Sequence, residues 1–226
     1  MSMKKVRLVR HGESAANAGA ATLDHASIPL TEKGLRQAER VAQSITQLPE
    51  LVITSPFTRA QATAAVTVCV HPTVPLEVWP IEEFTYLDPA ICVNTTVEQR
   101  KSWVDHYWAR SDPSYRDGGG AESFLDFVGR ARAFLDRLAA YPAQDILVFS
   151  HGQFLNVVVW LIESRPHQID DLAMLDWRRF EIENHIPNGC GYIVSCSPNA
   201  SISWSRSHSL NLDGARRPSA SRRLPF

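Results

Sequence analysis

Two histidines stand at the ends of apolar runs that are far apart in the chain. One residue separates His11 from the run 6–9, and one residue separates His151 from the run 146–149. A glycine comes directly after each histidine. Such β-branched runs indicate buried strands that stop at a glycine turn. In an open parallel sheet ligands bind at the carboxyl ends of the strands, so both histidines would face one crevice. Arg10 adds a permanent cation, and this combination suits an anion, most obviously phosphate, that is both bound and attacked.

His11 has the chemistry of a nucleophile toward phosphorus. A neutral imidazole offers a free nitrogen near pH 7. Its other ring nitrogen then has to donate a hydrogen bond, and a loop carbonyl is the expected acceptor. Gly12 lets backbone N–H groups approach an oxyanion. The alternative is a structural histidine at a strand end with its polar atoms satisfied.

A second cation and the second histidine follow two further strands. Arg59 lies in the first turn of the helix after strand 51–54, and two guanidiniums can hold phosphate oxygens bidentately. An arginine there opposes the helix dipole, which suggests a compensating anion rather than a merely solvated side chain. His151 and Gly152 open an apolar helix, 152–162, whose N-terminus favours anions. His151 could donate to the phosphate; otherwise it is a polar residue of the N-cap type.

Transfer of a phosphoryl group to His11 leaves an alkoxide, which an acid should protonate. Glu82 and Glu83 follow the strand 76–79 and are the candidates. A phosphate beside a carboxyl group should raise its pKa, because both groups are anionic at neutral pH. We favour Glu83, and expect the other glutamate to be a solvated charge at the end of the strand.

The order of the predicted strands and helices gives a parallel α/β layer fold. We expect three layers: a mostly parallel central sheet with helices on both faces. We expect one domain, 1–210, with an insertion or cap at about 84–122, and a disordered basic tail at 211–226. The predicted strands are 6–9, 51–54, 76–79 and 146–149. The predicted helices are 31–47, 59–68, 96–109, 123–140, 152–162 and 166–172. Two or three further strands are expected within 179–205, around a turn at Asn188-Gly189.

Composition narrows the possible partners. The chain has 226 residues, 44% of them hydrophobic and 21% charged, and a net charge of −1, which gives no sign of a nucleic-acid or membrane partner. Its four cysteines form no CxxC pair, so we expect reduced thiols in a cytoplasmic protein. We expect a small phosphorylated metabolite as partner, and a monomer or homodimer.

Several short motifs occur in a characteristic order. They are Arg10-His11-Gly12-Glu13 with Asn17, Pro29-Leu-Thr-Glu-Lys-Gly34, Ser55-Pro-Phe-Thr-Arg-Ala60 with Thr63-Ala64, Ile81-Glu-Glu83, Gly120-Ala-Glu-Ser123 with Arg130, Ser150-His-Gly152 and Ile186-Pro-Asn188. Over residues 6–196 the chain resembles the histidine phosphatase superfamily, also called phosphoglycerate-mutase-like. In this resemblance Ile186-Pro-Asn188 looks like the last strand of the family's sheet.

The resemblance implies a phosphohistidine at His11 and Glu83 as the proton donor. It also implies a phosphate pocket formed by Arg10, Arg59 and His151, with Asn17 assisting. We include Ser14, on the loop after His11, and Gly152, at the helix start, in the expected phosphate-binding set. No metal and no other cofactor is implied.

The leaving-group side departs from the family pattern. Where many members continue with an aromatic-Gly pair and Trp-Glu-Gly, residues 84–89 read Phe-Thr-Tyr-Leu-Asp-Pro. Four basic against six acidic residues in 84–122 argue against a doubly anionic substrate, and the aromatics there suggest a partly apolar leaving group. We therefore expect a phosphomonoesterase of the histidine acid phosphatase type. The alternatives are a phosphoglycerate-mutase-type phosphotransferase, which must exclude water, and a non-catalytic phospho-ligand binder.

Overall fold

The fold is that of a computed structural model, which describes residues 3–197 and 203–210; the tail expected at 211–226 lies outside this range. The strands are β1 (Lys4–Arg10), β2 (Leu51–Thr54), β3 (Leu76–Val78), β4 (Asp145–Ser150), β5 (Gly191–Ser197) and β6 (Ser203–Leu210). The helices are α1 (Glu32–Gln43), α2 (Thr58–Val70), α3 (Pro89–Cys92), α4 (Lys101–Arg110), α5 (Phe124–Ala140), α6 (Gly152–Ser164) and α7 (Asp171–Glu183).

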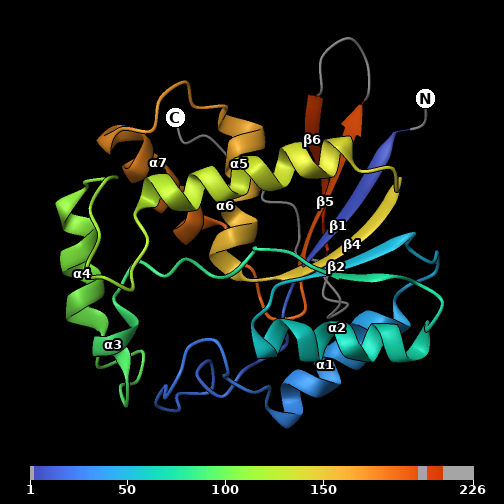
Figure 1. The fold of residues 1–226 in the computed structure, drawn as a ribbon, viewed down its shortest axis with the longest axis horizontal. Coiled ribbons are helices and arrows are strands. Elements are labelled where there is room, and N and C mark those ends of the chain that lie inside the picture. The colour runs from blue at the N-terminus through green and yellow to red at the C-terminus, as the bar shows by residue number, and fades with distance from the viewer. Residues whose placement is uncertain (1–2, 198–202, 211–226) are drawn as a thin grey trace, which may run out of the picture.

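The six strands form one sheet in the order β3-β2-β4-β1-β5-β6. The first four are mutually parallel, β5 pairs antiparallel with β1, and β6 pairs antiparallel with β5. Helices α1 and α2 cover one face and α5 and α6 cover the other (Figure 1). The expected three-layer α/β fold with a mostly parallel sheet is confirmed.

The two central strands, β1 and β4, send alternate side chains into two separate cores. Leu8 and Val148 are paired across the strands and belong to the larger core, under α5 and α6. Val9 and Phe149 are the next pair and belong to the smaller core, under α1 and α2. Burial on both faces explains why these strands read as continuous apolar runs rather than as alternating ones.

The most apolar helix, α6, is enclosed by the rest of the fold. Every residue from Phe154 to Ile162 is buried, where α6 packs against α5, α7 and the strands β1, β5 and β6. In the described ranges, no helix is both long and apolar enough to cross a membrane.

Two predicted helices are shorter than their sequence patterns. Helix α1 ends at Gln43 rather than near residue 47, because the Ser44 hydroxyl donates to the carbonyl of Val41 at 2.7 Å and the chain turns there. The helix predicted over 96–109 begins only at Lys101, and residues 97–100 form turns before it. Both differences concern helix ends, where competing side-chain hydrogen bonds decide the boundary.

The region after α6 contains the one large error of the sequence prediction. A helix at 166–172 and a strand from about 179 were expected, but α7 occupies Asp171–Glu183. Asp170 caps it by accepting from the Ala173 amide at 2.9 Å. Met174 and Trp177 bury one face of α7, so tertiary packing overrides the strand preference of its aromatic residues.

Candidate functional site

The two histidines lie side by side at the carboxyl ends of β1 and β4. Arg10 pairs with Ser150 in the sheet register, so the residues that follow them, His11 and His151, leave the sheet together. Their ring centroids are 5.1 Å apart, in an edge-on arrangement. Both rings are buried.

His11 is held in one tautomer. Its Nδ1 lies 2.6 Å from the carbonyl oxygen of Gly12, which can only accept, so Nδ1 carries the proton and Nε2 carries the lone pair. The loop carbonyl expected from the sequence is therefore present. Burial lowers the pKa of His11 well below its usual value, and the charges of Arg59 and Arg10 lower it further. His11 is consequently neutral at pH 7.

Arg59 reaches His11 from the first turn of α2. Its Nε donates to His11 Nε2 at 3.1 Å, and an Nη atom donates to the backbone oxygen of His25 at 2.7 Å. Only 6% of Arg59 is exposed, and burial lowers its pKa to about 10, still far above neutrality. A buried guanidinium beside a neutral imidazole forms a site for an anion.

Arg10 extends along the start of α6. It donates to the carbonyl of Ile186 at 2.6 Å, and its buried Nε has no partner in the described part of the protein. A Cβ atom on Gly152 would lie 3.5 Å from that Nε, so the glycine leaves room beside it. Gly152 is also the first residue of α6, where backbone N–H groups have no intrahelical acceptor. An anion placed here would meet both donors.

The two glutamates after β3 occupy different surroundings. Glu83 Oε1 accepts from the backbone N–H of Gln153 at 3.0 Å, and the side chain faces a cavity. Burial raises the pKa of Glu83, although Arg59 and Arg10 partly oppose this shift. Glu82 instead lies 3.4 Å from Arg130, outside the cavity lining. The structure thus places Glu83, and not Glu82, beside the arginines of the site.

Comparison with known proteins shows the family of this chain. The model of the histidine phosphatase superfamily (branch 1) matches residues 6–187. The chain belongs to the histidine phosphatase superfamily. An adenosylcobalamin/alpha-ribazole phosphatase from Salmonella typhi is 29% identical over 70% of this chain and 79% of its own. The "probable phosphoglycerate mutase GpmB" of Yersinia enterocolitica is 30% identical over 73% and 78%, respectively. The crystal structure of an alpha-ribazole phosphatase from Shigella flexneri shares the fold, with a TM-score of 0.69 and 22% identity over 95% of this chain and all of that one.

Ser14 and Asn17, two residues of the loop after His11, bind each other. Asn17 Oδ1 accepts from the backbone N–H and the hydroxyl of Ser14, at 3.2 and 3.1 Å. It also accepts from the amide of Asn188, which reaches the backbone oxygen of His11 at 3.0 Å. The segment 186–188 is a loop before β5, so its assignment to a strand was wrong. Its contacts with Arg10 and His11 nevertheless make it part of the site. No local sequence pattern predicted these contacts.

Ser55 fixes the tautomer of His151, a role that the sequence did not reveal. Ser55 Oγ lies 2.8 Å from His151 Nε2 and already accepts the backbone N–H of Phe57 at 3.2 Å. The hydroxyl is fully buried and has no other acceptor among the described residues, so its proton goes to Nε2. Nδ1 of His151 then carries the ring proton. That Nδ1 is buried and has no hydrogen-bond partner among the described residues. Burial, followed by the charge of Arg59, lowers the pKa of His151 well below its usual value.

We expect Ser55→Ala to lower kcat for phosphomonoesters about 10- to 100-fold, because His151 then loses the bond that directs its Nδ1–H. Ser55→Thr, which keeps the hydroxyl, should retain more activity than the alanine variant. The alanine variant should also become more sensitive to pH below neutrality, where a loosened His151 protonates. Equal kcat and pH profiles for the alanine variant and the wild type would contradict the role of Ser55.

Gly12 and Gly34 allow the histidine loop to pack directly on α1. A Cβ on Gly12 would lie 2.3 Å from the oxygen of Gly34, and one on Gly34 would lie 2.1 Å from the oxygen of Glu13. The N–H of Gly12 donates to Thr63 Oγ1 at 3.0 Å, so it is not directed at an oxyanion as the sequence suggested. These glycines serve close backbone contact instead.

Gly34→Ala should therefore destabilise the fold by about 1–3 kcal/mol and lower activity, because the backbone carrying Glu13 has to move. Gly129→Ala is the matched control, since a Cβ there meets no atom within 4 Å in the middle of α5. That control should be neutral or stabilise by up to about 1 kcal/mol. Thermal unfolding of both variants tests the difference, and similar midpoints would contradict it.

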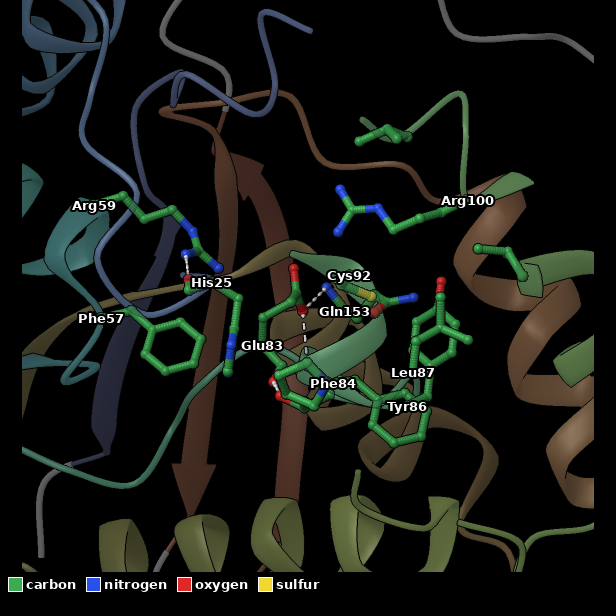
Figure 2. A pocket seen from close by; sticks show the side chains of 14 residues that line it. His25, Phe57, Arg59, Glu83, Phe84, Tyr86, Leu87, Cys92, Arg100 and Gln153 are labelled. Atoms are coloured by element: carbon green, nitrogen blue, oxygen red, sulfur yellow. Dashed lines mark hydrogen bonds between the residues drawn. The ribbon is translucent and has the colours of Figure 1, made fainter. Parts of the chain in front are cut away.

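A cavity of about 250 Å³ opens in front of Arg59 and Glu83. The residues Phe84, Tyr86 and Leu87 line it from the segment 84–122, which we call the cap segment, and His25 lines it from the loop after His11. Figure 2 shows Arg59 and Glu83 directed into this space. The end of the cap segment has a structural role: Glu122 binds Arg130 at 2.6 Å, and the next residue, Ser123, caps α5.

Proposed function

We propose that the protein is a phosphomonoesterase that works through a phosphohistidine on His11. The observation that carries this proposal is the fixed tautomer of His11, whose Nε2 lone pair lies beside Arg59 while its Nδ1 proton is bound by a backbone carbonyl. A neutral, oriented imidazole nitrogen next to guanidinium groups is what attack on a phosphate dianion requires.

The reaction has two displacement steps at phosphorus. As Arg59 turns from His11 Nε2 to a phosphate oxygen, Nε2 forms the N–P bond, the ester P–O bond breaks, and protonated Glu83 gives its proton to the leaving oxygen. Water then attacks phosphorus, Glu83 takes a proton from it, and the N–P bond breaks to release phosphate. Glu83 suits both steps because burial raises its pKa above the usual value of a glutamate, which favours the protonated form that the first step needs.

The remaining site residues hold the phosphate. Arg10 and Arg59 supply charge, His151 donates from Nδ1, and the N–H of Gly152 donates at the start of α6. Asn17 would donate to the phosphate from its side-chain amide N–H, because its Oδ1 already accepts hydrogen bonds from Ser14 and Asn188. The Ser14 hydroxyl donates to Asn17, so Ser14 acts by orienting that amide. These donors balance the charge of the transferred group, and the proposed mechanism uses no metal.

Hydrolysis is favoured over mutase activity by the charges of the cavity. A phosphoglycerate mutase has to hold a second phosphate and a carboxylate beside the transferred group, and besides Arg59 the cavity lining contains one further arginine or lysine, Arg100. The names of the Salmonella and Shigella relatives also favour a phosphatase. Four cysteines that form no disulfide support a cytoplasmic location.

Hydrolysis of p-nitrophenyl phosphate from pH 5 to 8 in the presence of EDTA tests the proposal. Turnover that survives EDTA supports a metal-independent phosphatase. Interconversion of 3-phosphoglycerate and 2-phosphoglycerate, primed with 2,3-bisphosphoglycerate and faster than hydrolysis, would favour the mutase. Tight phosphate binding without turnover of any ester would identify a binder.

A further inference from the structure

The cap segment carries four basic residues, but only Arg100 lines the cavity. The other three are engaged elsewhere: Lys101 pairs with Asp105 at 3.0 Å, Arg116 pairs with Asp126 at 2.7 Å, and Arg110 stacks on Tyr115 with its guanidinium carbon 3.9 Å from the ring centroid. None of the six acidic residues of the segment lines the cavity. The charge balance read from the sequence therefore does not describe the space in which a substrate would lie.

Arg100 is a half-buried guanidinium that has no carboxylate partner within residues 3–197 and 203–210. Its Nε donates to the backbone oxygen of Thr96 at 3.2 Å, and an Nη atom donates to the Thr22 hydroxyl at 3.4 Å. Across the described chain, no Asp or Glu lies within ion-pair distance of it, whereas Lys101 and Arg116 in the same segment are both paired. These neutral contacts orient Arg100 and leave its charge uncompensated.

Arg100 faces the phosphate end of the cavity from the opposite wall. In Figure 2 the guanidinium groups of Arg59 and Arg100 extend toward each other, with the Glu83 carboxylate between them. The wall beside them is apolar and includes Tyr86 and Val104. A substrate with its phosphate at Arg59 would thus pass an apolar surface before it reached the second cation.

From this arrangement we propose that the substrate is a phosphomonoester whose leaving group is partly apolar and carries one further anionic group, which Arg100 binds. The proposal rests on the proposed phosphatase function. It makes Arg100 a specificity-determining residue, because a charge-assisted hydrogen bond to a partly desolvated guanidinium discriminates strongly between a charged ester and its neutral analogue.

A matched pair of substrates tests this proposal. Phenyl phosphate offers the apolar leaving group alone. The 3- and 4-carboxyphenyl phosphates add a carboxylate at two different distances from the phosphate. We expect the wild type to prefer the better carboxylated ester by about tenfold or more in kcat/KM. In Arg100→Met this preference should fall to near unity, mostly through KM, and Arg100→Lys should keep part of it.

Lys101→Met is the matched control, because it removes a neighbouring cation that is exposed and paired with Asp105. It should leave the preference unchanged. Turnover of phenyl phosphate by Arg100→Met reports that the variant is folded. If the wild type hydrolyses phenyl phosphate without preferring either carboxylated ester, or if Arg100→Met keeps the preference, the proposal for Arg100 is wrong while the phosphatase stands. If no ester is hydrolysed, the proposed function fails and the proposal for Arg100 fails with it.

Discussion

Replacing His11 by alanine is expected to reduce kcat for phosphomonoester hydrolysis by about four orders of magnitude or more, since losses of this size follow removal of a nucleophile. The phosphate site itself should persist, because Arg10, Arg59 and His151 are held by contacts that do not all pass through His11. Arg59 donates to the backbone of His25, Arg10 to that of Ile186, and His151 is bonded to Ser55. The variant should therefore still bind inorganic phosphate.

The phosphoenzyme gives this prediction a second readout. Wild-type protein quenched during turnover of a labelled ester should carry phosphate that is stable in alkali and labile in acid, as phosphohistidine is, and His11→Ala should carry none. His106→Ala is the matched control, because His106 is exposed on α4 and lies outside the cavity lining. Equal turnover by His11→Ala and the wild type would show that His11 is not the nucleophile.

Sequence patterns identified the catalytic candidates because each of them follows a strand. Apolar runs can be recognised without a structure, and the residue after a buried parallel strand lies at the edge of the sheet where ligands bind. This reasoning brought His11, Arg59, Glu83 and His151 into one candidate site, and the structure places them together. The tautomer of His11 was predictable as well, because it depends on a neighbour one residue away.

Contacts between residues that are far apart in the chain could not be predicted from the sequence. Ser55 meets His151 over 96 residues of chain, and Asn188 meets His11 over 177. Neither pairing is set by local propensity, since both depend on how the ends of separate strands are aligned. For the same reason, the composition of the cap segment did not reveal that Arg100 alone among its cations faces the cavity. Helix α7 was missed because its aromatic residues favour strands until they pack against neighbouring helices.

Substituting Glu83 by glutamine should produce a loss that depends on the leaving group. For an alkyl phosphate the departing oxygen needs a proton, and loss of the acid should lower the rate of phosphoryl transfer about 10²- to 10⁴-fold. p-Nitrophenolate leaves without protonation, so the first turnover with p-nitrophenyl phosphate should fall by less than about tenfold. Dephosphorylation also uses Glu83, so rapid mixing should show a burst of nitrophenol followed by slow turnover.

The pH dependence follows from the same carboxyl group. Glu83 must be protonated to act as the acid, so kcat/KM for an alkyl phosphate should fall as the pH rises through its pKa, which burial has raised. His11 must be neutral, and because its pKa is lowered, the acidic loss should begin well below the usual range of histidine. Glu83→Gln should remove the alkaline limb and leave the acidic one.

Glu82→Gln is the control for Glu83→Gln, because it alters the adjacent glutamate, whose carboxylate faces Arg130 rather than the cavity. It should change neither the leaving-group dependence nor the alkaline limb. If Glu82→Gln instead showed the larger loss on alkyl phosphates, the proton donor would be Glu82, and the cavity would have to rearrange on binding to admit it. If both variants hydrolysed alkyl and nitrophenyl esters with equally reduced rates, neither carboxyl group would be the acid. The proton would then have to come from another donor at the leaving oxygen.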